Sequence, residues 1–175
     1  LEHRFPNFMG FYPLSGNNVC FPRALTIAGS DSSGGAGIQA DLKTFAAFGL
    51  YGSSVLCAVT AQNTTGVHAI QEIKTHVIAA QIDAVMSDIG TDVVKTGMLS
   101  NPEIIGAVSR KIRQHELNKL VVDPVMVAKG GHRLLQTEAV EALQTSLVPL
   151  ATVVTPNIPE AEVLTAMRIR NVDDA

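Results

Sequence analysis

Short apolar runs alternate with amphipathic stretches along most of this chain. Such runs are typical of strands that are buried on both faces, whereas apolar residues at helical spacing are typical of a helix that covers a sheet. The predicted strands lie at residues 25–28, 53–61, 92–96, 120–123 and 152–155. The predicted helices span residues 38–48 and 137–146 and begin near residues 75, 102 and 159. Strands that alternate with helices predict an α/β fold with a parallel, doubly wound sheet.

Local signals mark the ends of several predicted helices. Thr75 and Asn101 are expected to be N-caps, and Pro102 follows Asn101 in the first turn, where its missing N–H is harmless. Gly49 is expected to end the first helix. The residues predicted to form the apolar face of that helix are Ile38, Leu42, Phe45 and Phe48.

Ligands of open α/β sheets bind just beyond the carboxyl ends of the strands. In this chain those positions hold a glycine-rich turn and several large or polar side chains. The residues concerned are Gln62 with Asn63, Gly97 with Met98, Asp123 with Pro124 and Val125, and Thr155 with Asn157. Apolar walls combined with amide and carboxylate groups suit a small, flat heterocycle that forms hydrogen bonds along its edge.

The turn after the first strand is rich in glycine, with Gly29, Gly34, Gly35 and Gly37 in nine positions. Glycine leaves backbone N–H groups uncovered, and the amino end of the following helix favours anions. We therefore predict a binding loop rather than a plain connection between strand and helix.

Two nucleotide-binding motifs nearly match this loop. Gly29 and Gly34 have the spacing of a P-loop, but Gly35 and Ala36 stand where lysine and serine or threonine should follow. Residues 35–40 match the dinucleotide motif G-x-G-x-x-A, but the acidic residue expected after the second strand is missing. A P-loop ATPase and a nicotinamide-dependent dehydrogenase are therefore both disfavoured.

Composition narrows the choice further. A chain of 175 residues, 46% of them hydrophobic, can bury one core, so we expect one domain or most of one. A net charge of −3 without a basic run disfavours nucleic acid as a partner, and no apolar stretch is long enough to span a bilayer. Only Cys20 and Cys57 are present, which indicates a reducing compartment, and Cys57 is expected to be a buried structural thiol. Residues 1–22 lack the features of a secretory signal and are predicted to be an extension before a domain at 23–175.

Five ordered blocks of this sequence resemble the hydroxymethylpyrimidine/phosphomethylpyrimidine kinases of thiamine biosynthesis. The blocks lie at residues 28–44, 61–64, 95–99, 122–126 and 155–160, and the resemblance runs from residue 23 to about residue 164. It implies a three-layer, mostly parallel, ribokinase-like sheet. It also implies transfer of the γ-phosphoryl group of ATP, with Mg²⁺, first to the hydroxymethyl group of the pyrimidine and then to the resulting monophosphate. Related kinases are often dimers, and the cytoplasm is the expected compartment, with a plastid form as the alternative.

The resemblance also implies roles for six residues around the pyrimidine. Two would border the substrate, one would accept a hydrogen bond from it, one would read its nitrogen edge, and two would pack against the ring. In that order they are Gly29 and Ala36, Asp41, Gln62, and Met98 with Val125. The alternatives are that Asp41 is only a carboxylate in the first turn of a helix and that Met98 and Val125 are only core residues.

A second set of residues would serve the metal. Asn157-x-x-Glu160 is similar to the N-x-x-E motif that organises magnesium and phosphates in ribokinase-like kinases, and Asp123 would support the same ion. The alternative is an ordinary helix start, in which Glu160 only complements the helix dipole.

No catalytic residue is assigned. The resemblance places charge stabilisation and hydroxyl activation in a Gly-Thr-Gly-Cys-like segment at a helix amino end, and no such segment occurs before Ala175. The chain as given is therefore expected to be an incomplete kinase that holds pyrimidine weakly and does not turn over.

Two rival functions remain open. A pyridoxal kinase is the nearest, and we take Gln62 to favour an aminopyrimidine because an amide offers a donor and an acceptor side by side. A non-catalytic domain that binds the pyrimidine without ATP is the other.

Overall fold

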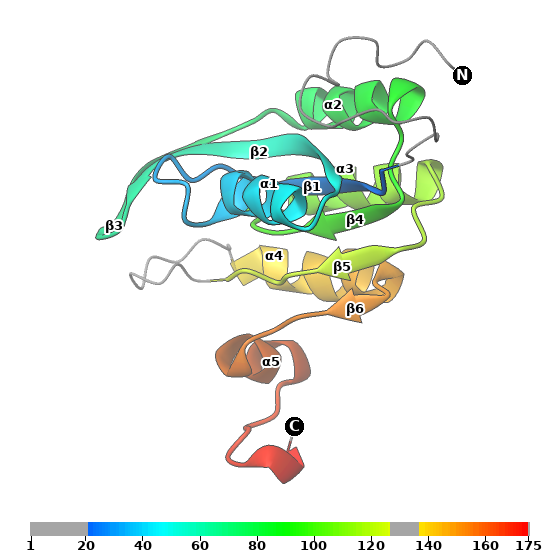
Figure 1. Cartoon of the computed structure of the whole chain (residues 1–175). Helices are drawn as coiled ribbons and strands as arrows, with labels where there is room; N and C mark the ends of the chain where they lie inside the picture. Colours follow the sequence, from blue (N-terminus) through cyan, green and yellow to red (C-terminus); the bar gives the residue numbers. More distant parts are fainter. Residues whose placement is uncertain (1–20, 127–136, 175) are drawn as a thin grey trace.

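The computed structural model describes residues 21–126 and 137–174, in which six strands form one sheet in the order β3-β2-β1-β4-β5-β6 (Figure 1). Five of the strands are parallel, and β3 pairs antiparallel with β2. The strands are β1 (Arg23–Gly29), β2 (Tyr51–Asn63), β3 (Gly66–Glu72), β4 (Val93–Thr96), β5 (Leu120–Val122) and β6 (Val153–Val154).

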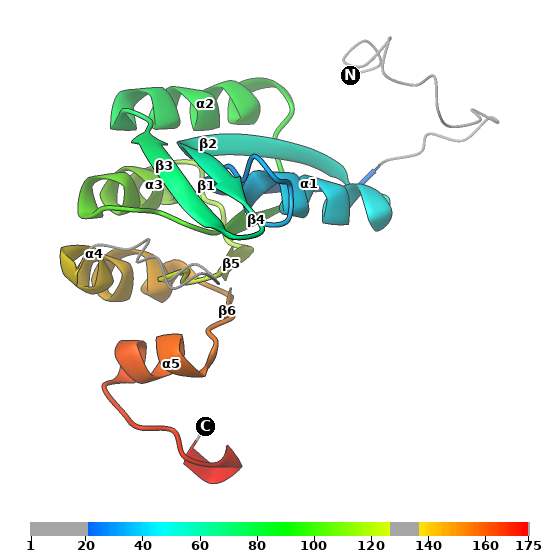
Figure 2. The same cartoon turned by 90° about the vertical axis from the view of Figure 1, so that its left-hand side faces the viewer.

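Helices cover both faces of this sheet. α1 (Gly37–Ala47) lies on one face, whereas α2 (Thr75–Asp88), α3 (Pro102–Gln114) and α4 (Thr137–Ala142) lie on the other (Figure 2). α4 continues into a π-helical turn at Leu143–Leu147 and a 3₁₀ turn at Val148–Leu150. The arrangement confirms the predicted three-layer, mostly parallel α/β fold.

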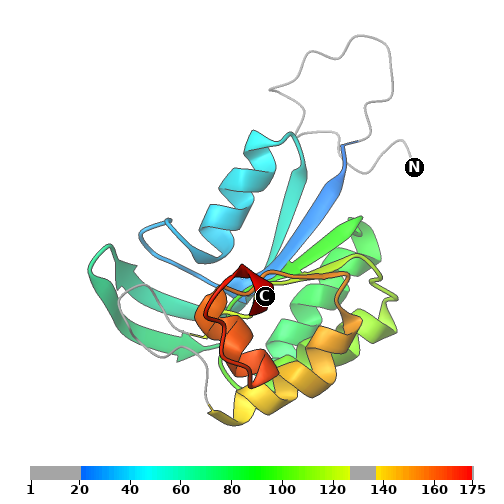
Figure 3. The ribbon, with the colours of Figure 1, turned by 90° about the horizontal axis from the view of Figure 1, so that it is seen from below.

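α5 (Ile158–Thr165) follows the edge strand β6 and lies beyond the sheet together with the 3₁₀ turn at Val172–Asp174 (Figure 1), so that in the view from below α5 is in front of the other elements (Figure 3). It begins with the N-cap Asn157, close to the predicted start. Gln144 Nε2 donates to the carbonyl oxygen of Leu164 at 2.7 Å, which ties the end of α5 to the turn after α4.

The core forms where apolar strand residues meet α2 and α3. β1 is buried along nearly its whole length, as a central strand covered on both faces should be. In α3, the four predicted inward residues Ile104, Ile105, Val108 and Ile112 are all buried, and Asn101 Oδ1 caps the helix by accepting from the Ile104 N–H at 2.9 Å. Cys57 is also buried, and burial raises the pKa of its thiol to about 12. The thiol therefore stays protonated at neutral pH, as expected of a structural cysteine.

Strand β3 was missed in the sequence. The prediction ended the second strand near Gln62, but β2 continues to Asn63 and turns back into β3 through a hairpin in which Asn63 Oδ1 accepts from the N–H of Thr65 and of Gly66. Most of β3 is exposed, so its sequence carries no buried apolar run that would mark it as a strand.

Two finer predictions were also wrong. Phe48 is 79% exposed and lies at the C-cap of α1, outside the face on which Leu42 and Phe45 pack against Gly52. Thr75 is the first residue of α2, and Lys74 is its N-cap without a side-chain hydrogen bond.

Residues 1–20 lie outside the described residues, so the division into an extension at 1–22 and a domain at 23–175 stays a prediction. In the part of the chain that the structure describes, no helix combines the length and the apolar character needed to cross a membrane.

Gly37 should be the least replaceable glycine of the loop. Its φ is +57°, and a β-carbon there would lie 2.4 Å from the Gly29 carbonyl oxygen. We expect Gly37→Ala to lower the free energy of unfolding by about 3 kcal/mol or more, since left-handed strain and overpacking add. Gly49→Ala is the matched control, because Gly49 also has a positive φ (+73°) but open space around it, and it should cost only about 1–2 kcal/mol. Urea unfolding followed by circular dichroism measures both, and equal losses would contradict the close approach.

Candidate functional site

The glycine-rich loop is closed by a carboxylate of the chain itself. Asp31 is 2% exposed, and its Oδ1 accepts from the Ser33 N–H at 2.8 Å and from Ser33 Oγ at 2.7 Å. Its Oδ2 accepts from the N–H groups of Gly35 at 3.0 Å and Ala36 at 2.8 Å. Burial raises the pKa of Asp31, but these hydrogen bonds outweigh burial, so its pKa lies below the ordinary value of 3.8.

This finding changes the meaning of the loop. Backbone N–H groups that we expected to meet an anionic ligand instead bind Asp31, so at Gly35 and Ala36 the anion is internal. The sequence signal was an aspartate directly before Ser-Ser-Gly-Gly, a position from which a short carboxylate reaches the N–H groups that follow it. Sequence reasoning did not use it.

The loop also runs along the end of β2. The Ser30 N–H donates to the Ala58 carbonyl at 2.8 Å, and Thr60 Oγ1 donates to the Ser30 carbonyl at 2.7 Å. Further along, Ser32 Oγ donates to the Gln62 carbonyl at 2.6 Å and accepts from the Gln62 N–H at 2.8 Å. Figure 1 shows the loop and the β2–β3 hairpin at the same end of the sheet.

Gln62 therefore lies beside the loop, half-buried, with its backbone fixed. Its side-chain Oε1 lies 3.3 Å from Thr60 Oγ1, whose single hydrogen is donated to the nearer Ser30 carbonyl at 2.7 Å. Its Nε2 has no hydrogen-bond partner within residues 21–126 and 137–174, so an amide donor is available at the end of β2. This is the kind of group that the predicted reading of a pyrimidine edge requires.

Gly29 and Met98 touch. They follow the neighbouring strands β1 and β4, and a β-carbon at position 29 would lie 2.5 Å from Met98 Cε. Met98 is 8% exposed, so this contact is equally compatible with a core residue and with one wall of a ligand site. Val125 is half-buried in a turn after β5, in which its N–H donates to the Asp123 carbonyl at 2.9 Å.

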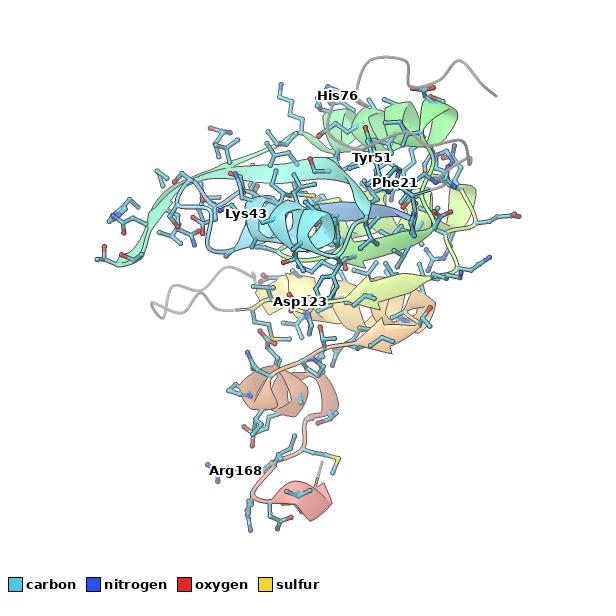
Figure 4. The ribbon with its side chains drawn as sticks, in the orientation of Figure 1. Phe21, Lys43, Tyr51, His76, Asp123 and Arg168 are labelled. Carbon is cyan, nitrogen blue, oxygen red and sulfur yellow. The ribbon has the colours of Figure 1, made fainter. Side chains whose placement is uncertain are left out.

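Asp41 and Asp123 share one lysine. Lys95 Nζ lies 3.1 Å from both carboxylate oxygens of Asp41 and 3.4 Å from Asp123 Oδ2. Thr26 Oγ1 donates to Asp41 Oδ2 at 2.6 Å. Figure 4 shows Asp123 below α1, the helix that carries Asp41. Asp41 lies in the second turn of α1. It is therefore not the first-turn carboxylate that the alternative interpretation expected.

Asn157 and Glu160 form a capping box at the start of α5. Asn157 Oδ1 accepts from the Glu160 N–H at 2.9 Å, and Glu160 Oε2 accepts from the Asn157 N–H at 3.0 Å. Glu160 is 7% exposed, and its Oε1 accepts from the Met126 N–H at 3.4 Å. The helix-start alternative is thus realised, which leaves a metal role for these two residues as a prediction.

No metal centre gathers among the described residues, because nowhere in residues 21–126 and 137–174 do three or more His, Cys, Asp or Glu side chains cluster as metal ligands. Of the three residues predicted for the metal, Asp123 lies beside Lys95, whereas Asn157 and Glu160 lie at the start of α5. The short segment 123–126 joins these two places. Asp123 begins this segment beside Lys95, and Met126 ends it on Glu160. Carboxylate oxygens so engaged fit a hydrated ion held through water better than a directly bound one.

The predicted site residues thus form several separate groups of contacts, and no single group contains all of them. A pocket of about 350 Å³ lies at the amino ends of the strands, where Thr91 and Asp92 precede β4 and Asn118 and Lys119 precede β5. It contains none of the predicted site residues.

The sequence model of the family described as phosphomethylpyrimidine kinase matches residues 31–175. The chain belongs to the phosphomethylpyrimidine kinase family. The hydroxymethylpyrimidine/phosphomethylpyrimidine kinase of Bacillus subtilis is 53% identical to it over 152 residues, which are 87% of this chain and 56% of that protein. The chain spans about half the length of the curated relatives it matches.

Solved structures place this family member among ribokinase-like kinases, as predicted. The crystal structure of phosphomethylpyrimidine kinase from Clostridium difficile shares 56% identity with a TM-score of 0.83, over 87% of this chain and 66% of that one. The pyridoxal kinase from Staphylococcus aureus, in complex with AMP-PCP and pyridoxal, shares 39% identity with a TM-score of 0.77, over 89% of this chain and 56% of that one.

Asp31→Asn should destabilise the loop. Whichever way the amide is turned, its NH₂ group faces N–H donors that now contact a carboxylate oxygen, and we expect a loss of about 2–3 kcal/mol at pH 7. Because the pKa of Asp31 is lowered in the folded state, its contribution is complete above the ordinary value of 3.8 and disappears as the pH falls through the folded-state pKa. The difference between wild type and variant should therefore shrink as the pH falls below the ordinary value of 3.8.

Urea unfolding across this pH range measures the effect. Glu141→Gln is the control, since Glu141 is exposed and its side chain binds nothing among the described residues. A difference for Asp31→Asn that does not change with pH would contradict an ionised Asp31 as the centre of the loop.

Proposed function

We propose that this chain is the pyrimidine-binding part of a kinase that uses ATP to phosphorylate 4-amino-5-hydroxymethyl-2-methylpyrimidine and its monophosphate in thiamine biosynthesis. Membership of the phosphomethylpyrimidine kinase family over residues 31–175 supports the reaction class. The observation that carries the substrate is Gln62, whose backbone is fixed by Ser32 at the end of β2 and whose side-chain Nε2 has no partner among the described residues.

The proposed pocket uses the six predicted substrate residues. Gly29 and Met98, in contact at the ends of β1 and β4, would form an apolar wall, with Val125 in the turn after β5. Ala36 would border the substrate from the loop that Asp31 holds in shape. Asp41 would accept a hydrogen bond from a donor of the ligand, such as its hydroxyl or its exocyclic amine.

ATP and Mg²⁺ are the proposed cofactors. The proposal for ATP draws on solved relatives, among them one in complex with AMP-PCP. Magnesium, when bound, would neutralise phosphate charge. Asp123 and Glu160 would hold it through water, because Asp123 Oδ2 already forms an ion pair with Lys95 and both oxygens of Glu160 already accept hydrogen bonds. Asn157 would act by fixing Glu160.

Phosphorylation of pyridoxal is the second candidate. It is favoured by the likeness to pyridoxal kinases, at 39% identity and a TM-score of 0.77 for the one solved with pyridoxal. The two candidates differ in ring chemistry, because an aminopyrimidine offers an amine beside a ring nitrogen to the amide of Gln62, whereas the pyridoxal ring has no such amine. A non-catalytic pyrimidine-binding domain predicts the same binding without phosphoryl transfer from ATP.

A homodimer in the cytoplasm completes the proposal. The free, buried thiol of Cys57 suits a reducing compartment. The dimer is proposed from the family resemblance, and analytical ultracentrifugation tests it. The plastid alternative depends on residues 1–22, most of which lie outside the described residues.

Gln62→Met tests the substrate assignment. Loss of one amide hydrogen bond should weaken binding of the pyrimidine about tenfold while pyridoxal binding changes less than about twofold. Calorimetric or NMR titration with each compound measures this. Gln71→Met is the matched control, because Gln71 lies on the same hairpin with its Nε2 on the Glu72 carbonyl, and it should leave both affinities unchanged. Tighter binding of pyridoxal by the unmodified chain would overturn the assignment in favour of the second candidate.

A further inference from the structure

Lys95 is the only cation within reach of two predicted site carboxylates among the described residues. Its Nζ is 3.1 Å from each oxygen of Asp41 and 3.4 Å from Asp123 Oδ2. The side chains of Lys95, Asp41 and Asp123 are 22%, 17% and 35% exposed. These three residues, which we call the lysine hub, come from β4, α1 and the end of β5, so the hub joins three elements at the candidate site.

The surrounding chain is shaped for this lysine. Lys95 pairs in register with Thr26 on β1, so both side chains project from the same face of the sheet, toward α1 and Asp41. A β-carbon at Gly97 would lie 3.1 Å from Lys95 Nζ and 3.0 Å from Ala28 Cβ. Glycine at position 97 therefore leaves the room that the ammonium group occupies.

The donors of Lys95 and the acceptors of Asp41 indicate what the hub does. An ammonium group has three donors, and Lys95 donates to both carboxylate oxygens of Asp41 and forms an ion pair with Asp123 Oδ2. The ammonium group is therefore directed at the two carboxylates of the hub. Asp41 Oδ2 accepts from both Thr26 and Lys95, whereas Oδ1 accepts from Lys95 alone, so one acceptor position remains free on Oδ1.

The charges point the same way. Two carboxylates that lie within 3.4 Å of one nitrogen would repel each other without it. With Lys95 in place, both carboxylates keep their orientation toward the same ammonium group.

We propose that Lys95 is a positioning residue, which holds Asp41 so that its Oδ1 presents a single acceptor to a donor group of the ligand and which keeps Asp123 beside it. This inference rests on the proposed function, because it assigns the ligand contact to Asp41. It adds that the amine or hydroxyl of the pyrimidine binds an oriented carboxylate and that Lys95 itself touches no substrate atom.

Two double-mutant cycles test the hub, each built from Lys95→Met, Asp41→Asn and the double variant. The first cycle measures unfolding in urea without ligand. Each single substitution should raise the equilibrium constant of unfolding by some factor. If Lys95 and Asp41 interact, the factor for the double variant should be roughly tenfold smaller than the product of the two single factors. Should Lys95→Met fail to fold, Lys95→Gln, which keeps a polar head, replaces it in both cycles.

The second cycle measures the dissociation constant of 4-amino-5-hydroxymethyl-2-methylpyrimidine by NMR titration. Lys95→Met should weaken binding about tenfold, as Asp41→Asn should, and the double variant should be no weaker than Asp41→Asn alone. Losses that multiply, or an unchanged affinity of Lys95→Met, would overturn the positioning role. A lysine that is merely structural would not produce this dependence on Asp41.

Lys111→Met is the matched control. Lys111 is 17% exposed and donates to Asp83 at 2.6 Å and 2.8 Å, but it joins α3 to α2 on the opposite face of the sheet. It should lower stability without changing the affinity for the pyrimidine by more than about twofold.

The two cycles also separate this inference from the proposed function. If the unmodified chain binds no pyrimidine while the stability cycle still shows coupling, the proposed function is overturned, and the ligand-positioning role with it. If the pyrimidine binds but the stability cycle is additive, the hub alone is overturned.

Discussion

The close approach of α1 to the end of β1 is the constraint on which the rest of this end of the molecule depends. Gly37 starts α1 with a φ of +57°, directly against the Gly29 carbonyl oxygen, and no other residue fits there without displacing backbone. The approach aims α1 across β1, so that Asp41, one turn later, reaches Thr26 and Lys95 on the sheet. The same approach forces the intervening residues into a tight loop, which Asp31 closes from within.

Two buried or half-buried ionic groups stabilise this geometry in different ways. Asp31 is satisfied by N–H and hydroxyl donors of its own loop, so it depends on no second charge and serves the local shape of the chain. The lysine hub depends on residues far apart in the sequence and serves the relation between α1, β4 and the end of β5. The first group fixes the loop, and the second fixes the carboxylates over the strands.

Much of the fold and part of the site could be predicted from the sequence. Apolar runs such as 53–61 and the cap at Asn101 are local signals, and they gave the right elements because burial and capping depend on neighbouring residues. β3 escaped because an exposed edge strand needs no apolar pattern, only a partner strand with free backbone groups. Phe48 was misplaced because helical spacing does not show where the helix ends relative to the sheet.

The sequence by itself determined the alternation of strands and helices, the glycine loop and the family, because these follow from local patterns and from ordered motifs along the chain. Only the tertiary structure decided what the charged groups of the site contact. Lys95 stands in a strand of four residues, and nothing nearby in the chain indicates that its partners are Asp41 and Asp123. Glu160 likewise matches a metal motif and a capping box equally well in sequence, and its contact with Met126 exists only because the segment after β5 meets the start of α5 in space. A charge binds the nearest partner in three dimensions, and that distance is set by packing rather than by order along the chain.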